Sequence, residues 1–309
     1  MKKIIFFIPV LFLSMVTVGQ DAADTAWKVN GDLSLMFTQS SFTNWAPGGE
    51  NSVTINGFFN FYAGYTKGIS KWENFLSLAY GQSKTGDIDW RKSEDKIDFQ
   101  STYGIKAAEK WYYTANLNFK SQFAEGYNYH DDDPNLSPEK ISNFMAPGYI
   151  SAGLGMEYRP KDYVSFYLAP ITARWIIVAD QDLANLGAFG VEKAELDPFD
   201  STVIIQGEKV RQEFGAYFRF LFVKDIMKNV NFSTKLELFS DYTRQPGNID
   251  VNWDNMLNFT VNDWINASFG FQLVYDDDTP ITDKDGKTGP RTQFRESLAI
   301  GLAYKFANR

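Results

Sequence analysis

Apolar and polar residues alternate strictly over residues 52–65, and this pattern recurs along most of the chain. One side of the stretch carries Val53, Ile55, Gly57, Phe59, Phe61, Ala63 and Tyr65, and the other carries Ser52, Thr54, Asn56, Phe58, Asn60, Tyr62 and Gly64. A period of two predicts a β-strand with one buried and one wet face. The apolar face therefore lies against either a protein core or lipid.

The same alternation predicts twelve strands, of a length that suits a tilted crossing of a bilayer. Their ranges are 27–38, 52–66, 72–82, 96–107, 111–123, 149–159, 163–175, 209–222, 230–242, 249–261, 264–276 and 292–306. One face of most segments is almost wholly apolar. In 111–123, for example, Leu117 lies opposite Asn116 and Asn118.

The connections between these strands are alternately short and long. Short ones lie at 67–70, 107–110, 159–162, 223–229 and 261–263, and long ones lie near 39–51, 83–95, 124–148, 176–208, 243–248 and 277–291. Outer-membrane barrels have an even number of strands, short periplasmic turns and longer outer loops. The predicted fold is therefore all-β: a single antiparallel up-and-down transmembrane β-barrel of about 12 strands, with long extracellular loops and short periplasmic turns.

A soluble β-sandwich is the alternative, because its strands also alternate. A sandwich has no reason to sort long and short connections onto opposite ends. Its packed interior would also leave little room for the charged residues on the polar faces. A closed barrel removes sheet edges, which a bilayer requires because it offers no water to unpaired backbone groups.

Composition supports the barrel. Aromatic residues make up 17% of the 309 residues, with 27 Phe, 16 Tyr and 8 Trp, yet the mean hydropathy is −0.31. Aromatic girdles and a polar interior are typical of outer-membrane barrels. The net charge of −8 argues against nucleic acid as a partner. The absence of cysteine excludes disulfides and a lipoprotein attachment site.

Both ends of the chain carry targeting signals. Lys2 and Lys3 precede an apolar run that ends at Val18, which predicts a signal peptide over residues 1–20 and a barrel domain over 21–309. The chain ends in SLAIGLAYKF followed by three residues, which resembles the C-terminal signal that the barrel-assembly machinery reads. The predicted location is the bacterial outer membrane, with the lipid bilayer, lipopolysaccharide and that machinery as partners.

A short motif after the first strand carries a family resemblance. The segment SFTNWAPGGENSVTINGF resembles an uncharacterised family of Bacteroidetes outer-membrane β-barrel proteins with an NWxxGG(E/D)NS-like signature. The matching residues are Asn44, Trp45, Gly48, Gly49, Glu50, Asn51 and Ser52. The resemblance implies a barrel fold and its location, and little about activity. The glycines permit tight backbone turns. The motif therefore predicts either a folded loop that seals the first hairpin or a loop that contacts a ligand.

The sequence contains few residues that could act in catalysis or bind a metal ion. His130, the one histidine, lies in a loop without an adjacent serine, so the Ser–His pair of an outer-membrane lipid-modifying enzyme is not predicted. Two acidic clusters, 131–133 and 276–278, lie at outer strand ends and could bind Ca²⁺ or Mg²⁺ weakly. A hydrated acidic rim is the favoured interpretation. We therefore expect neither a cofactor nor a catalytic residue.

Charged residues on the polar strand faces form the remaining constellation. The predicted lumen charges are Glu73, Asp98, Lys120, Arg219, Lys235 and Glu237, with Lys106, Glu213, Asp254 and Arg295 on the same faces. Both signs occur in similar number, which predicts salt bridges across a narrow interior or a neutral polar channel. Twelve strands also leave a small lumen compared with general porins, so we expect a mostly filled barrel.

Three functions remain open. The first is a non-enzymatic outer-membrane barrel that acts as a narrow or plugged channel or as a structural or assembly partner. The others are a lipid-modifying enzyme and a secreted soluble β-protein. The loop 176–208 bears on the first, because loops of this length tend to be functional. We expect a short helix at 180–194 and an extension of the following strand at 202–206. We also expect the loop's apolar side chains to be buried on other outer loops or over the lumen mouth, against the loop of Trp45, so that the loop forms a cap.

Overall fold

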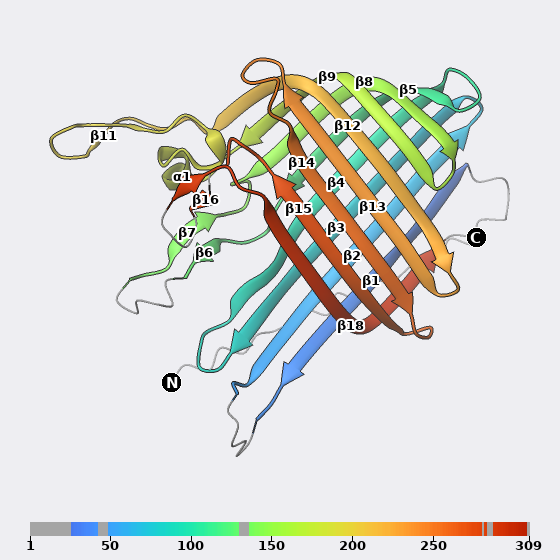
Figure 1. The fold of residues 1–309 in the computed structure, drawn as a ribbon, viewed down its shortest axis with the longest axis horizontal. Coiled ribbons are helices and arrows are strands. Elements are labelled where there is room, and N and C mark those ends of the chain that lie inside the picture. Colours follow the sequence, from blue (N-terminus) through green and yellow to red (C-terminus); the bar gives the residue numbers. More distant parts are fainter. Residues whose placement is uncertain (1–25, 43–48, 130–135, 280, 283–286, 308–309) are drawn as a thin grey trace.

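The protein is a closed antiparallel β-barrel of twelve strands (Figure 1). A computed structural model describes residues 26–42, 49–129, 136–279, 281–282 and 287–307. Around the barrel the order is β1-β18-β15-β14-β13-β12-β9-β8-β5-β4-β3-β2, so sequence neighbours pair throughout and the last strand closes on the first. None of the helices in the described residues is long and apolar enough to cross a membrane. The predicted fold class is confirmed.

The barrel strands follow the predicted ranges within a few residues. They are β1 (Trp27–Ser40), β2 (Ser52–Lys67), β3 (Ser70–Thr85), β4 (Arg91–Lys106), β5 (Trp111–Ser121), β8 (Gly148–Lys161), β9 (Val164–Ile177), β12 (Val210–Met227), β13 (Val230–Asp241), β14 (Asp250–Thr260), β15 (Ile265–Tyr275) and β18 (Gln293–Ala307). The turns after β2, β4, β8, β12 and β14 are short and lie together at one end. The longer connections gather at the other, which we call the loop end (Figure 1).

The seam between β1 and β18 depends on a close approach. Gly31 pairs with Phe306 across this seam. A Cβ on Gly31 would lie 2.5 Å from the Phe306 ring. Glycine therefore leaves the space in which the last aromatic residue of the barrel packs.

The strands turn their apolar faces outward and their polar faces inward. In β5, the outward Trp111, Tyr113 and Leu117 are exposed, whereas the inward Asn116 and Asn118 are buried. A soluble core would produce the opposite arrangement, so the outward belt is a lipid-facing surface. Outward aromatic rings also meet at the short-turn end. Examples are Trp27 and Tyr65, 5.1 Å apart, and Trp111 and Tyr158, 4.7 Å apart.

The longest connection, between β9 and β12, has two halves with different packing. Its inner half holds α1 (Gln181–Asn185) and the 3-10 turn η1 (Ala188–Gly190). Leu183, Ala184 and Val191 form a small core with Ala146 and Val178, and Phe189 packs against it. The expected short helix is present, and it packs on the connection between β5 and β8.

The outer half of this connection differs from the prediction. Residues 203–205 form β11 (Val203–Ile205), which pairs with β10 (Glu195–Leu196) in a separate hairpin and does not extend β12. The hairpin projects away from the barrel (Figure 1). Its apolar side chains are exposed, with Phe199 at 97%, so the expected burial of this half is wrong. A two-stranded hairpin on its own offers no second layer on which those side chains could pack.

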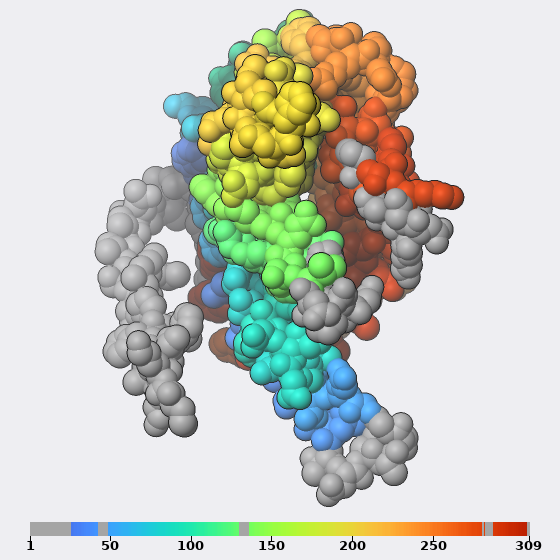
Figure 2. All heavy atoms as spheres, turned by 90° about the vertical axis from the view of Figure 1, so that its left-hand side faces the viewer, coloured from blue at the N-terminus to red at the C-terminus, as the bar shows by residue number. Residues whose placement is uncertain are grey.

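Two further two-stranded hairpins decorate the loop end. They are β6 (Gly126–Asn128) with β7 (Glu139–Ser142), and β16 (Ile281–Thr282) with β17 (Thr288–Gly289). Figure 2 looks onto this end, where the yellow segment of the β9–β12 connection and the green segment around β6 and β7 lie on one side and red segments lie on the other. The loops therefore lie on two sides of the barrel mouth in this view.

Candidate functional site: the barrel lumen and its mouth

All six residues predicted as lumen charges lie on inward strand faces. We define the packed wall as the inward faces of β4, β5, β8, β9, β12 and β13. Its buried polar and aromatic residues are Asp98, Thr102, Thr114, Asn116, Asn118, Glu157, Ser165, Tyr167, Thr172, Arg211, Glu213, Tyr217, Arg219, Glu237 and Phe239. Buried charges require partners, and three groups of ion pairs along the lumen supply them for the charged residues of this wall.

The first group crosses the middle of the lumen. Lys120 Nζ on β5 lies 2.5 Å from Glu237 Oε2 on β13, although three strands separate β5 from β13 around the barrel. Lys235 on β13 reaches Asp98 on β4 at 3.4 Å. Tyr217 donates a hydrogen bond of 2.7 Å to the other oxygen of Glu237. These contacts tie opposite sides of the barrel together and fill the space between them.

The second group lies toward the short turns. Arg159 pairs with Glu73 and, at 2.9 Å, with Glu157. Glu157 also contacts Arg219 at 3.5 Å. Glu73 accepts a further hydrogen bond of 2.9 Å from Tyr62. Glu73 and Arg219, both predicted from the alternation, thus join one network through two residues that were not predicted.

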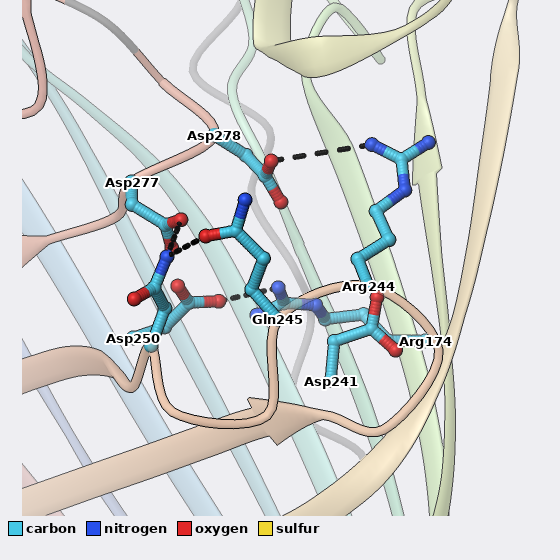
Figure 3. Close-up of a pocket in the computed structure, with 8 residues that line it drawn as sticks. Arg174, Asp241, Arg244, Gln245, Asp250, Asp277 and Asp278 are labelled. Carbon is cyan, nitrogen blue, oxygen red and sulfur yellow. Dashed lines mark hydrogen bonds and ion pairs between the residues drawn. The ribbon is translucent and has the colours of Figure 1, made fainter.

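The third group forms a pocket at the loop end (Figure 3). Arg174 pairs with both Glu213 and Asp250. Beside it lies a cavity of about 300 Å³ lined by Arg174, Asp241, Arg244, Gln245, Asn248, Asp250, Asp277 and Asp278. Arg211 on β12 reaches Asp278 at 3.0 Å. A Cβ on Gly190 would lie 2.2 Å from Arg211 Nη1, so glycine at this position lets η1 approach that arginine.

The acidic rim at this mouth is largely paired by the protein itself. Carboxylate oxygens of Asp250, Asp276 and Asp277 lie within 4.8 Å of one another, a spacing that could hold a cation. Asp250 is paired with Arg174, however, and Asn248 donates a hydrogen bond of 2.5 Å to Asp277. Asp131–Asp133, Asp283 and Asp285 lie outside the described residues. The described part of the rim is therefore a mixed-charge network.

The remaining part of the lumen is more open. We define the open wall as the inward faces of β14, β15 and β18. Met256 points inward, because it pairs with the inward Ser233, yet it is 38% exposed. Ser297 and Arg295 on β18 also face inward and are exposed. The inward Phe75 of β3, a strand that belongs to neither wall, is also 40% exposed. Water therefore reaches inward-facing side chains on this side of the barrel.

The motif after β1 is only partly described. Asn44, Trp45 and Gly48 lie outside the described residues, as do His130 and residues 1–25. Gly49 has a φ of 143°, which favours glycine. Asn51 Oδ1 accepts a hydrogen bond of 2.6 Å from the Phe42 amide, and Glu50 lies beside Gly86. These contacts fold the base of the loop, and a ligand-contacting role for the motif stays a prediction.

Several lumen residues were not predicted from the sequence. Glu157 lies on the polar face of its predicted strand, so the alternation alone could have found it. Arg159 lies at the boundary between the predicted strand 149–159 and the predicted turn 159–162, whereas β8 continues to Lys161. Arg174 was missed for a different reason. A register shift between β9 and β12, near Pro170, changes which residues of β9 face inward.

Comparison with known proteins adds a family match and a general likeness of fold. Residues 37–127 match a family described as a protein of unknown function (DUF3078), which is less than half of the chain. The match spans the motif region and agrees with the predicted resemblance to an uncharacterised family. The motif itself and a Bacteroidetes origin stay predictions. The comparison with curated proteins found no match.

Similar solved structures include two channels and a translocator domain. The NanC porin covers 88% of this chain and 98% of its own length, at 8% identity and a TM-score of 0.37. An outer membrane channel from Pseudomonas putida F1 (COG4313) matches over 93% of this chain and 100% of its own length, at 11% identity and a TM-score of 0.38. The translocator domain of the autotransporter NalP from Neisseria meningitidis matches over 93% of this chain and 90% of its own length, at 8% identity and a TM-score of 0.35. This similarity is too low to carry an argument about function, which rests on the residues of this chain.

Proposed function

We propose that the protein is a non-enzymatic outer-membrane β-barrel that acts as a narrow channel, with its aqueous path along the open wall. The outward apolar belt and its aromatic girdle support a bilayer as the surrounding medium. Lipopolysaccharide outside and the barrel-assembly machinery during biogenesis are the partners that this location implies. Residues 1–20 act as the signal peptide in this proposal.

The observation that carries the proposal is the exposure of inward-facing residues in the middle of the open wall, whereas most inward-facing residues of the packed wall are buried or half-buried. Met256 and Ser297 lie near the middle of β14 and β18, away from either barrel end, and both are exposed. Their small or flexible side chains leave room opposite the charged residues of the packed wall. A continuous row of such positions would form a path for ions and small polar solutes.

The packed wall sets the width of that path. The ion pairs from Lys120 to Glu237 and from Lys235 to Asp98 occupy the interior between β4 and β13. Because each pair joins strands far apart around the barrel, the paired side chains fill part of the lumen cross-section and connect its opposite sides. The path is therefore narrower than a twelve-strand circumference alone would give.

The test compares two tryptophan substitutions at adjacent positions of β18. Ser297→Trp places an indole in the proposed path, whereas Leu298→Trp places the same side chain on the lipid-facing surface, where leucine is 73% exposed. Single-channel conductance in planar bilayers should fall strongly in Ser297→Trp and stay at the wild-type value in Leu298→Trp. Heat-dependent mobility in detergent gels establishes that both variants fold.

Other outcomes point to the alternative functions. A folded wild-type barrel without conductance would overturn the channel and favour a structural or assembly role. Lipid hydrolysis that is lost in His130→Ala would favour an enzyme. Recovery of the mature protein outside the membrane fraction would favour a secreted soluble protein.

A further inference from the structure

The ion pairs at the centre of the lumen and on the open wall share an orientation that determines which sign of charge meets water there. Pairs nearer the two barrel ends do not share it, since Glu73 is about as exposed as Arg159 and Asp278 is more exposed than Arg211. In each pair that adjoins the proposed path, the basic side chain is the more exposed member and the acid lies deeper. The inward charges are nearly balanced in number, so their count alone does not predict a preference. The depth of the charged groups does predict whether anions or cations are preferred, because a solvated charge acts on a passing ion more directly than a charge that is buried and already paired.

The centre of the lumen shows this orientation most clearly. Lys96 is 46% exposed, whereas its partner Asp98 is 5% exposed. Lys120 is 28% exposed and Glu237 is 6% exposed. Asp98 is shared with Lys235, and Glu237 is shared by Lys120 and Lys235. Two buried carboxylates are thus covered by three ammonium groups.

The open wall repeats the arrangement. Arg295 on β18 pairs with Glu94 on β4, and the arginine is 51% exposed whereas the glutamate is 12% exposed. Lys96 lies two residues beyond Glu94 on the same inward face. The guanidinium of Arg295 and the ammonium of Lys96 therefore border the same water-accessible space from two walls.

Further acidic groups face this part of the lumen, and they are less exposed than Lys96 and Arg295. Asp254 pairs in register with Lys235 and is half-buried. Asp32 is half-buried near the short turns and accepts a hydrogen bond of 3.1 Å from Asn60. At the mouth, Asp250 is paired with Arg174. Each of these carboxylates has a protein donor or a neighbouring cation, whereas Lys96 and Arg295 extend into water.

We infer that the path selects anions over cations, and that its solutes are inorganic anions and small organic acids. This inference rests on the proposed channel function and names its substrate class. The exposed cations supply an attractive site at the centre of the path. The buried carboxylates keep those cations in place without presenting negative charge to the solute.

The test is the reversal potential across a planar bilayer with a KCl gradient. The wild-type channel should give the sign that marks chloride as the more permeant ion. Lys96→Gln with Arg295→Gln removes two exposed cations and leaves Asp98 paired with Lys235, so the reversal potential should shift toward potassium. Lys228→Gln is the matched control, because Lys228 lies in the exposed turn after β12 and its loss should leave the potential unchanged.

The outcomes separate this inference from the channel proposal. Conductance with a potassium preference, or with no preference, would overturn anion selectivity and leave the channel standing. Absence of conductance from a folded barrel would overturn both. If the double variant misfolds, Lys96→Gln alone gives the same test with a smaller expected shift, and an unchanged potential in that folded variant would count against the inference.

Discussion

The packed wall and the open wall are built from the same kind of strand, yet their inward faces differ in both side-chain size and burial. The packed wall carries long charged side chains such as Arg219, which is 2% exposed. The open wall carries Ser268, Gly270, Ser297 and Ala299 at comparable positions, and of these Ser297 is exposed, Ser268 and Ala299 are half-buried and Gly270 is buried. Long side chains from several strands meet and bury one another, whereas short ones leave the space to water.

This difference shows how a barrel of fixed strand number can tune its bore. The strand number sets the circumference, and the inward residues decide how much of it is filled. Charges are suited to filling a wet interior, because an ion pair across the lumen satisfies both members while water remains nearby. The contrast between the walls therefore predicts that the same kind of substitution lowers the free energy of unfolding by different amounts on the two walls.

The largest effect is expected from Glu237→Ala on the packed wall. Glu237 contacts Lys120, Lys235 and Tyr217. Its loss leaves the three lysines of this group with Asp98 as the remaining carboxylate of the group. Removal of one member of a buried ionic network costs about 3–5 kcal/mol. Arg295→Ala is the control on the open wall, where a half-exposed pair contributes at most about 1 kcal/mol. Urea unfolding in lipid vesicles measures both values. Equal losses would show that the two walls do not differ as described.

A lysine on the lipid-facing surface is expected to have the next largest effect. Leu117→Lys should lower the free energy of unfolding by about 2–4 kcal/mol, because Leu117 is outward and faces the hydrocarbon. Asn116 would be the obvious inward control, but it is buried and donates a hydrogen bond of 2.8 Å to Thr102, so a lysine there is not tolerated. Ser297→Lys on the open wall is the suitable control, and it should fold normally. A stable Leu117→Lys barrel would contradict the assigned faces.

The connection between β9 and β12 offers a smaller, pH-dependent effect over the packed wall. Asp180 caps α1 by accepting from the amides of Asp182 and Leu183, and it pairs with Lys140 at 2.5 Å. The hydrogen bond from Lys140 lowers the pKa of Asp180 to about 2. Because the folded pKa is lowered, this stabilisation is present above the unfolded pKa of about 4 and is lost as the pH falls through about 2.

Asp180→Ala should remove that cap and cost about 0.5–2 kcal/mol locally, as loss of an N-cap does. Hydrogen exchange of the Ala184 amide, which is bonded to the Asp180 carbonyl at 3.0 Å, reports on this segment. Protection of this amide, relative to its intrinsic exchange rate at the same pH, should fall in the variant at neutral pH and in the wild type only at low pH. Unchanged exchange in Asp180→Ala would show that the hydrophobic core of Leu183 and Val191 holds the segment without its cap.

The sequence predicted the strands, their faces and the closed barrel, because alternation and connection length depend on local chemistry alone. It also predicted that Glu73 and Arg219 face the lumen. It did not predict their partners, since contacts across a lumen depend on the tilt and stagger of strands far apart in sequence. The register shift near Pro170 could not be predicted either, because strict alternation assumes that a strand keeps the same faces along its whole length. Tyr167 and Arg174 both face inward although strict alternation would put them on opposite faces.

The smallest expected effect concerns the outer half of the same connection, where hydrophobicity alone predicted burial and the prediction was wrong. Phe199 is 97% exposed at the tip of the β10–β11 hairpin, so it buries almost no apolar area in the folded chain. Because burial is what makes a phenylalanine stabilising, Phe199→Ser should change the free energy of unfolding by less than about 0.5 kcal/mol. Leu183→Ala, in the inner half, should cost about 2–5 kcal/mol locally, because Leu183 is buried in a packed cluster. Urea unfolding and hydrogen exchange of the two variants measure the contrast. A loss in Phe199→Ser as large as that in Leu183→Ala would mean that the hairpin tip is covered in the folded protein, and its apolar residues would then belong to the packed side of the molecule.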